Sequence, residues 1–209
     1  GPPSPVWTGS PFPGLRAFTP ADEPIFFGRA RETDRLVAKL AGSGCRFMLI
    51  VGASGSGKSS LVAAGLIPRL AANAIPGSED WLLPQVRADA PGRSWVGLRF
   101  TPGEQGADPF QAVAAKLAPL LPDDRLPREV AQELATDHEL LRTLVERALI
   151  DRPARAEALL FVDQFEELIT VVSDDLRTRF IGSLAAAAAS RRIRVVGTVR
   201  SDFYHRCIE

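Results

Sequence analysis

The sequence is poor in the residues that build metal centres and disulfide frameworks. Its two cysteines, Cys45 and Cys207, lie far apart and match no metal-ligand spacing. We therefore expect both to be free thiols in a reducing compartment. The only two histidines, His138 and His205, leave little room for a histidine-based metal site, and the sequence assigns neither of them a role.

The sequence also lacks net charge and long apolar runs. Lysine plus arginine equals aspartate plus glutamate, 25 each, so the overall charge favours neither nucleic acid nor an anionic membrane surface as a partner. The run Ala185–Ala189 is too short and too weakly apolar to span a bilayer, and we recognise no secretory leader. These features predict a cytoplasmic protein, and 209 residues suffice for one large α/β domain.

Residues 46–60, RFMLIVGASGSGKSS, are the stretch around which the chain is organised. An apolar run, typical of a buried parallel strand, is followed by Gly52, four residues, Gly57, Lys58 and Ser59, which is the P-loop pattern. In such loops backbone N–H groups bind phosphate oxygens. Lys58 would reach the β- and γ-phosphates, and the Ser59 hydroxyl would ligate Mg²⁺. The nucleotide-binding residues predicted here are Gly52, Ser54, Gly55, Ser56, Gly57, Lys58, Ser59 and Ser60.

A second apolar run, Leu159–Val162, ends on Asp163. In a chain with a P-loop, this acid is predicted to be the Walker B aspartate, which holds Mg²⁺ through a water. Glu166 and Glu167 follow, and either could polarise the attacking water as a general base. The alternative is that both acids favour a helix N-terminus through its dipole. Glu104 is a rival candidate for the base.

The third apolar run, Ile193–Arg200, predicts another buried strand. Arg200 at its end could reach a γ-phosphate and report its presence. The alternative is an arginine on a solvated surface.

Apolar periodicity and turn-forming residues predict the remaining elements. We expect helices over Arg29–Ala41 and Lys58–Ala71, the second kinked or ended by Pro68. The other predictions are strands near Leu83–Arg87 and Trp95–Phe100 that could form a hairpin, a helix begun by Asp108-Pro109, a short helix over Arg128–Ala135, and a capping box at Thr136–Glu139 before a helix that reaches Leu149.

The order of these parts resembles the novel STAND NTPases, a mostly bacterial branch of the signal-transduction ATPases. The resemblance covers residues 11–207, in the runs GLRAFTPADEPIFFGR, VGASGSGKSSLVAAGLIPRL, LLFVDQFEELIT and VVGTVRSDFYHRC. The acidic pair at +3 and +4 after Asp163 is similar to NACHT-like branches. The resemblance implies that Phe27, Gly28 and Arg29 line the adenine side and that Arg200 is the sensor 1 arginine. On sequence alone, Phe26 and Phe27 fit core positions equally well.

The resemblance also implies a fold. It is a three-layer α/β P-loop NTPase fold with a mostly parallel sheet of the additional-strand type, in which the sensor strand lies between the P-loop and Walker B strands. Two departures stand out. Ala30 occupies a position where many relatives carry an acid, although Glu32 is nearby, and the sequence stops just after the sensor strand.

The family continues there with a last strand, a helical and winged-helix lid, and often repeats. We therefore expect a fragment of a larger switch protein. Its segments would be a flexible arm or tag remnant at 1–10, an adenine-side segment and helix at 11–45, and an incomplete P-loop NTPase core at 46–209.

The function implied is that of an ATP- or ADP-binding module in a signalling ATPase. It would be a Mg²⁺-dependent switch with slow hydrolysis that couples ligand sensing by missing sensor domains to a fused or neighbouring effector, with homo-oligomerisation on activation. The isolated chain is expected to be weakly active at most. Two alternatives remain, a non-catalytic nucleotide-binding scaffold and a P-loop kinase for a small acceptor. No Asn-Lys-x-Asp guanine signature is present.

Overall fold

A computed structural model describes residues 29–42, 44–86 and 95–207. Its main sheet has four parallel strands in the order β1 (Phe47–Gly52), β6 (Ile193–Arg200), β5 (Ala158–Val162) and β4 (Arg99–Phe100). Hydrophobic runs of this length suit strands that are covered on both faces. The predicted α/β class, the parallel sheet and the position of the sensor strand between the other two are all confirmed.

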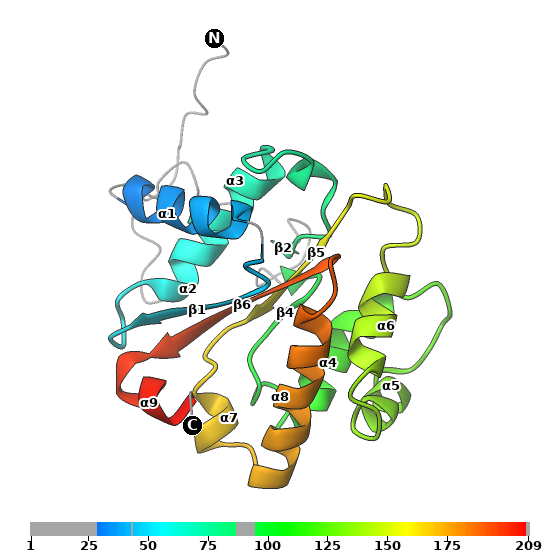
Figure 1. Ribbon diagram of the computed structural model, residues 1–209. Coiled ribbons are helices and arrows are strands. Elements are labelled where there is room, and N and C mark those ends of the chain that lie inside the picture. Colours follow the sequence, from blue (N-terminus) through cyan, green and yellow to red (C-terminus); the bar gives the residue numbers. More distant parts are fainter. Residues whose placement is uncertain (1–28, 43, 87–94, 208–209) are drawn as a thin grey trace.

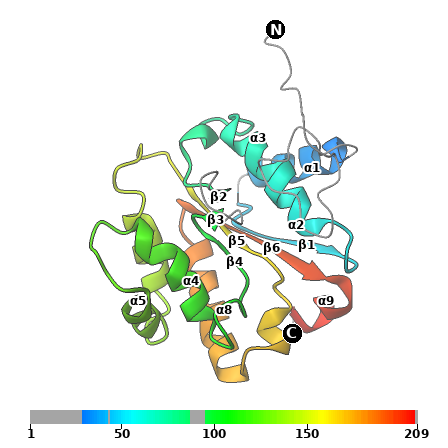
Figure 2. The same cartoon turned by 180° about the vertical axis from the view of Figure 1, so that it is seen from behind.

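Helices cover both faces of the sheet (Figures 1 and 2). One face carries α1 (Ala30–Ala41) and the P-loop helix, whose apolar side chains form one buried cluster with strand residues such as Phe161. The larger cluster lies on the other face. It is covered by α4 (Pro109–Leu117), α5 (Pro127–Leu134), α6 (Leu140–Arg147) and α8 (Asp174–Ala188). The shorter helical elements are α7 (Glu167–Thr170), α9 (Tyr204–Cys207) and the 3₁₀ turns Ser78–Asp80, Ala118–Leu120 and Ser201–Phe203.

The P-loop helix runs over the predicted range but is not uniform. It begins as α2 (Lys58–Ser60), widens to a buried π-helical segment over Leu61–Leu66, and ends as α3 (Ile67–Ala71). Pro68 lies at the start of α3, directly after the π-helical segment, and the helix continues through it to Ala71. The predicted range is therefore confirmed, and of the two outcomes expected for Pro68, a kink or an end, the helix does not end there.

The predicted hairpin is confirmed, but its second strand is shorter than expected. Strand β2 (Gln85–Val86) pairs antiparallel with β3 (Trp95–Val96). The chain then turns at Gly97, whose φ of +93° favours glycine. Residues Arg99–Phe100 form the separate strand β4, which pairs with β5 in the main sheet. The prediction of one strand over Trp95–Phe100 is therefore wrong, because the glycine turn divides it.

Helix starts were predicted with mixed success. Asp108 caps α4 as expected, since its Oδ1 accepts from the N–H of Phe110 at 2.9 Å. The capping box at Thr136–Glu139 does not form. The Thr136 hydroxyl instead donates back to the carbonyl of Glu133 at 2.8 Å, because this threonine lies just beyond Ala135, the C-cap of α5.

Candidate functional site

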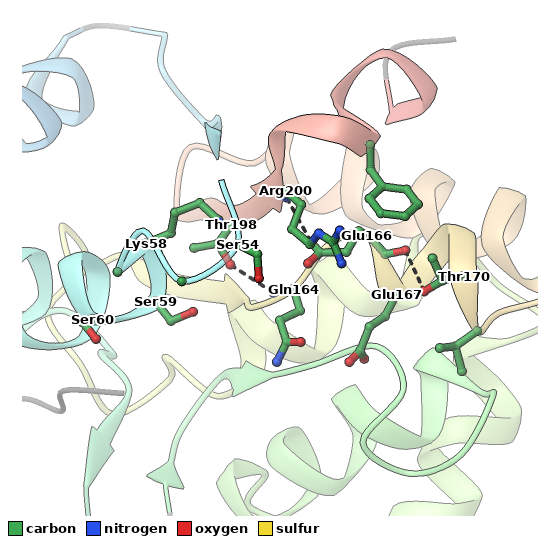
Figure 3. A pocket seen from close by; sticks show the side chains of 14 residues that line it. Ser54, Lys58, Ser59, Ser60, Gln164, Glu166, Glu167, Thr170, Thr198 and Arg200 are labelled. Atoms are coloured by element: carbon green, nitrogen blue, oxygen red, sulfur yellow. Dashed lines mark hydrogen bonds between the residues drawn. The ribbon is translucent and has the colours of Figure 1, made fainter. Parts of the chain in front are cut away.

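Three parallel strands end at one edge of the sheet, and a pocket of about 550 Å³ lies there. The register places Gly52 at the end of β1 opposite Arg200 at the end of β6, and Val162 of β5 opposite Gly197. Figure 3 shows the side chains that converge on this space. The lining residues are Ser54, Gly55, Gly57, Lys58, Ser59, Ser60, Gln164, Glu166, Glu167, Thr170, Val171, Thr198, Arg200 and Phe203.

The P-loop backbone is shaped by its glycines. Gly55 and Gly57 have φ values of +72° and +78°, a region that side chains disfavour. The loop closes around Lys58, whose Nζ donates to the carbonyl oxygens of Gly52 and Ala53 at 2.8 Å each. A phosphate bound here would have to replace these carbonyls as the partner of the ammonium group.

Asp163 lies just behind the pocket and is only 2% exposed. Its Oδ1 accepts from the hydroxyl groups of Ser59 at 2.5 Å and Thr198 at 2.6 Å, and its Oδ2 lies 2.7 Å from Nη2 of Arg99. Both hydroxyl groups line the pocket, whereas Asp163 is not among the lining residues. Asp163 therefore acts on the pocket through the hydroxyl groups that it holds.

These oxygen atoms fit a magnesium ion held jointly with a nucleotide. The Ser59 hydroxyl donates its proton to Asp163, which leaves oxygen lone pairs for a cation on its pocket side. Within the described ranges, no group of three His, Cys, Asp or Glu side chains could hold a metal alone. Mg²⁺ typically takes only one or two protein ligands plus waters and phosphates, so Ser59 and Asp163 are the residues that would hold it.

The two acids after β5 have different surroundings. Glu166 is 8% exposed, and its Oε2 accepts from the backbone N–H of Arg200 at 3.3 Å. Glu167 accepts from the N–H of Gly103 at 2.7 Å and thereby joins α7 to the loop after β4. Both line the pocket, whereas the rival acid Glu104 lies outside the lining and pairs with Lys116 at 3.2 Å.

Arg200 lines the pocket but its guanidinium is engaged elsewhere. Its Nε and Nη2 donate to the two carboxylate oxygens of Asp202 at 3.2 and 2.7 Å, and the group lies 5.2 Å from the ring centroid of Phe203. The hydrogen bond from Arg200 lowers the pKa of Asp202, and the charge of Lys58 lowers it further. The ion pair is therefore in its charged form at neutral pH.

Arg29 is the described member of the predicted adenine-side trio, since Phe27 and Gly28 lie outside the described residues. Its Nη1 donates to the carbonyl of Ser56 at 2.6 Å, and its Nε lies 3.4 Å from the carboxylate of Glu32. Arg29 thus braces the P-loop from the start of α1, and Glu32 helps to orient it.

Two of the predicted P-loop residues support the loop and do not line the pocket. Gly52 accepts from Lys58, and Ser56 accepts from Arg29. A Cβ at Gly52 would lie 2.8 Å from Oγ of Ser56, so the loop packs closely against this glycine.

The sequence analysis did not identify Gln164, which lines the pocket, or Arg99, which pairs with Asp163 behind it. Gln164, with a φ of +55°, directly follows Asp163 and donates its N–H to the Thr198 hydroxyl at 3.0 Å. Arg99 was not singled out because it lies inside the predicted strand Trp95–Phe100 and belongs to no motif. The signal available for it was an arginine inside an otherwise apolar run, since a buried cation needs a partner.

No helix in the described part of the chain is both long and apolar enough to cross a membrane. A solved structure of a Walker-type ATPase from Pyrococcus abyssi is similar, with 18% identity and a TM-score of 0.49, over 90% of this chain and 49% of that one. The chain thus spans about half the length of that structure. The comparison with curated proteins found no match. The family model described as novel STAND NTPase 1 matches residues 11–209. The chain therefore belongs to the novel STAND NTPase 1 family and is a nucleotide-binding NTPase module.

Proposed function

We propose that this module binds ATP and ADP as the Mg²⁺-dependent switch of a STAND-type signalling ATPase with slow hydrolysis. The observation that carries the proposal is one pocket that collects Lys58 and Ser59 from the P-loop, Glu166 from the loop after β5 and Arg200 from the end of β6. These groups supply a phosphate-binding cation, a metal-binding hydroxyl, a proton acceptor and a second cation.

In this proposal the P-loop binds the phosphates. The backbone N–H groups at the start of α2 donate to phosphate oxygens. The ammonium of Lys58 leaves its two carbonyl partners and binds phosphate oxygens in their place. Ser59 and Asp163 hold Mg²⁺, which, when bound, offsets the phosphate charge. Arg29 keeps the loop in shape through Ser56 and, with Phe27 and Gly28, serves the adenine side.

Glu166 is proposed as the general base that accepts the proton of the attacking water. Its carboxylate is shielded from bulk water and fixed by the backbone of Arg200. Glu167 is proposed to assist by holding the loop at Gly103 against the pocket. Arg200 is proposed to sense the γ-phosphate, and its guanidinium must leave Asp202 to do so.

The signalling role extends this proposal to the whole protein. We infer a closed ADP state and an open, oligomerising ATP state that activates a fused or neighbouring effector after a sensor domain binds its ligand. Residues 11–45 would serve the adenine side, and residues 46–209 would form the NTPase core. The family membership supports a nucleotide-driven switch as the common element.

Thermal unfolding with and without nucleotide tests the proposal. ADP at about 100 times its Kd should stabilise the chain by about 2.7 kcal/mol. Without nucleotide, the Lys58→Ala variant should melt close to the wild type, since Nζ of Lys58 donates to the loop carbonyls of Gly52 and Ala53. With nucleotide, it should lose the shift. Equal shifts in both proteins, or no shift in the wild type with either ADP or ATP, would contradict nucleotide binding by this loop.

A further inference from the structure

Arg99 is paired with the predicted Walker B acid. It lies at the start of β4, and its Nη2 lies 2.7 Å from Oδ2 of Asp163. The Asp163 side chain is 2% exposed and the Arg99 side chain 20%. The guanidinium also lies 5.7 Å from the ring centroid of Phe161. Little solvent separates or surrounds the pair, so its electrostatic interaction is weakly screened.

The contacts of Asp163 divide between its two oxygens. Oδ1 accepts from the hydroxyl groups of Ser59 and Thr198, which both line the pocket. Oδ2 faces Arg99, which is not among the lining residues. One oxygen of the carboxylate thus binds the hydroxyl groups at the pocket. The other oxygen faces the guanidinium of Arg99, whose positive charge offsets the negative charge of Asp163.

We propose that Arg99 is a positioning residue of the nucleotide site, which fixes the Asp163 carboxylate and lowers the affinity of the Ser59–Asp163 pair for a divalent cation. This inference rests on the proposed function. Affinity of an oxygen site for Mg²⁺ or Ca²⁺ grows with the negative charge of its ligands. A neighbouring cation reduces that charge and repels the incoming ion directly.

Arg99 is not among the residues that line the pocket, so we do not expect a phosphate bound there to meet its guanidinium. Ser59 and Thr198 lie between Asp163 and the pocket, and Arg99 lies on the opposite side of the carboxylate. Removing its charge should therefore change the response to the cation and leave metal-free nucleotide binding intact. A phosphate-binding arginine would give the opposite pattern.

The experiment measures thermal unfolding at saturating ADP across a MgCl₂ titration, at constant ionic strength, and again in EDTA. The Arg99→Gln variant should reach any given Mg²⁺-induced stabilisation at a concentration at least about fivefold lower than the wild type, which corresponds to about 1 kcal/mol. The Arg99→Lys variant keeps the charge and should stay close to the wild type. In EDTA, all three proteins should bind ADP with similar affinity.

Arg46→Gln is the matched control. Arg46 also forms a partly buried ion pair, 2.5 Å from Glu157, but it precedes β1 at the opposite end of the strand. Its loss should lower the melting temperature without changing the response to Mg²⁺.

The following results would contradict the proposed role of Arg99. An unchanged or weaker Mg²⁺ response in Arg99→Gln overturns the inference alone, as does a loss of ADP binding in EDTA. If Arg99→Gln does not fold without ligand, Mg²⁺ with ADP should restore a cooperative transition because the cation replaces the lost charge, and failure to restore it also overturns the inference. A wild-type chain that binds no ADP overturns the proposed function and this inference with it.

Discussion

The backbone N–H of Arg200 donates to Oε2 of Glu166 over 3.3 Å. This hydrogen bond joins the last residue of β6 to the loop after β5. The proposed base and the proposed phosphate sensor are thereby held in one local arrangement. Any movement of the Arg200 backbone would change the position of the acid.

Glu166→Gln should abolish hydrolysis but keep nucleotide binding. The amide can still accept from the N–H of Arg200 but cannot take a proton from water. We expect phosphate release to fall by about 10²-fold or more. The ADP affinity should stay within about threefold of the wild type, or roughly 0.6 kcal/mol, because the amide has the same shape and keeps the hydrogen bond to Arg200. Phosphate-release kinetics and calorimetry provide the two measurements.

Glu104→Gln is the matched control for that variant. Glu104 lies outside the pocket and pairs with Lys116, so hydrolysis should be unchanged. If Glu104→Gln lost hydrolysis and Glu166→Gln kept it, the general base would be Glu104 and the assignment of Glu166 would be wrong.

Arg29→Gln should weaken ADP binding through the P-loop. Its hydrogen bond to the Ser56 carbonyl spans 2.6 Å and is partly exposed, so its loss should cost about 1 kcal/mol, or about fivefold in Kd. Arg31→Gln, on the same helix and exposed, is the control. A Kd unchanged in Arg29→Gln would show that the loop keeps its shape without the brace.

Asp202 should titrate below its ordinary pKa of 3.8, because the hydrogen bond from Arg200 favours the charged form. A lowered folded-state pKa contributes stability that is present above the unfolded pKa and is lost as the pH falls through the folded pKa. The ion pair should therefore persist at neutral pH and open only in acid. Carboxyl-carbon NMR titration measures this directly, and Arg200→Met should return the pKa of Asp202 to its ordinary range.

Phe100→Ala should strongly destabilise the larger hydrophobic cluster. Phe100 is fully buried, and its ring meets that of Phe180 edge-on at a centroid distance of 6.0 Å. Such truncations cost about 3–5 kcal/mol. Urea unfolding should show this loss, whereas Ile150→Ala, at a side chain 67% exposed, should stay within about 0.5 kcal/mol. Similar losses in both variants would mean that Phe100 contributes little to the core.

Local patterns predicted the parts of the fold that local chemistry determines. The spacing around Lys58 and the apolar runs before Asp163 and Arg200 identified three strands, and the resemblance ordered them correctly. The cap at Asp108 followed from its neighbour Pro109. These signals depend on residues adjacent in sequence, so no knowledge of distant packing was needed.

Features that depend on distant contacts were missed. The pairing of Arg99 with Asp163 joins residues on different strands, and no motif marks it. The π-helical turns before Pro68 depend on packing around a wholly buried segment. The ion pair of Arg200 with Asp202 was also missed, although the two residues are close in sequence, because no motif marks the 3₁₀ turn that brings them together.

The central place of β6 has a mechanical consequence. It pairs with β1 along Phe47–Gly52 and with β5 along Ala158–Val162. Backbone hydrogen bonds on both sides of β6 therefore hold the three strands together as one rigid sheet. Sliding any of the three would break a whole ladder of backbone hydrogen bonds. If this module switches with its nucleotide as proposed, we therefore expect the side chains and loops at the ends of the strands to move while the sheet itself stays rigid.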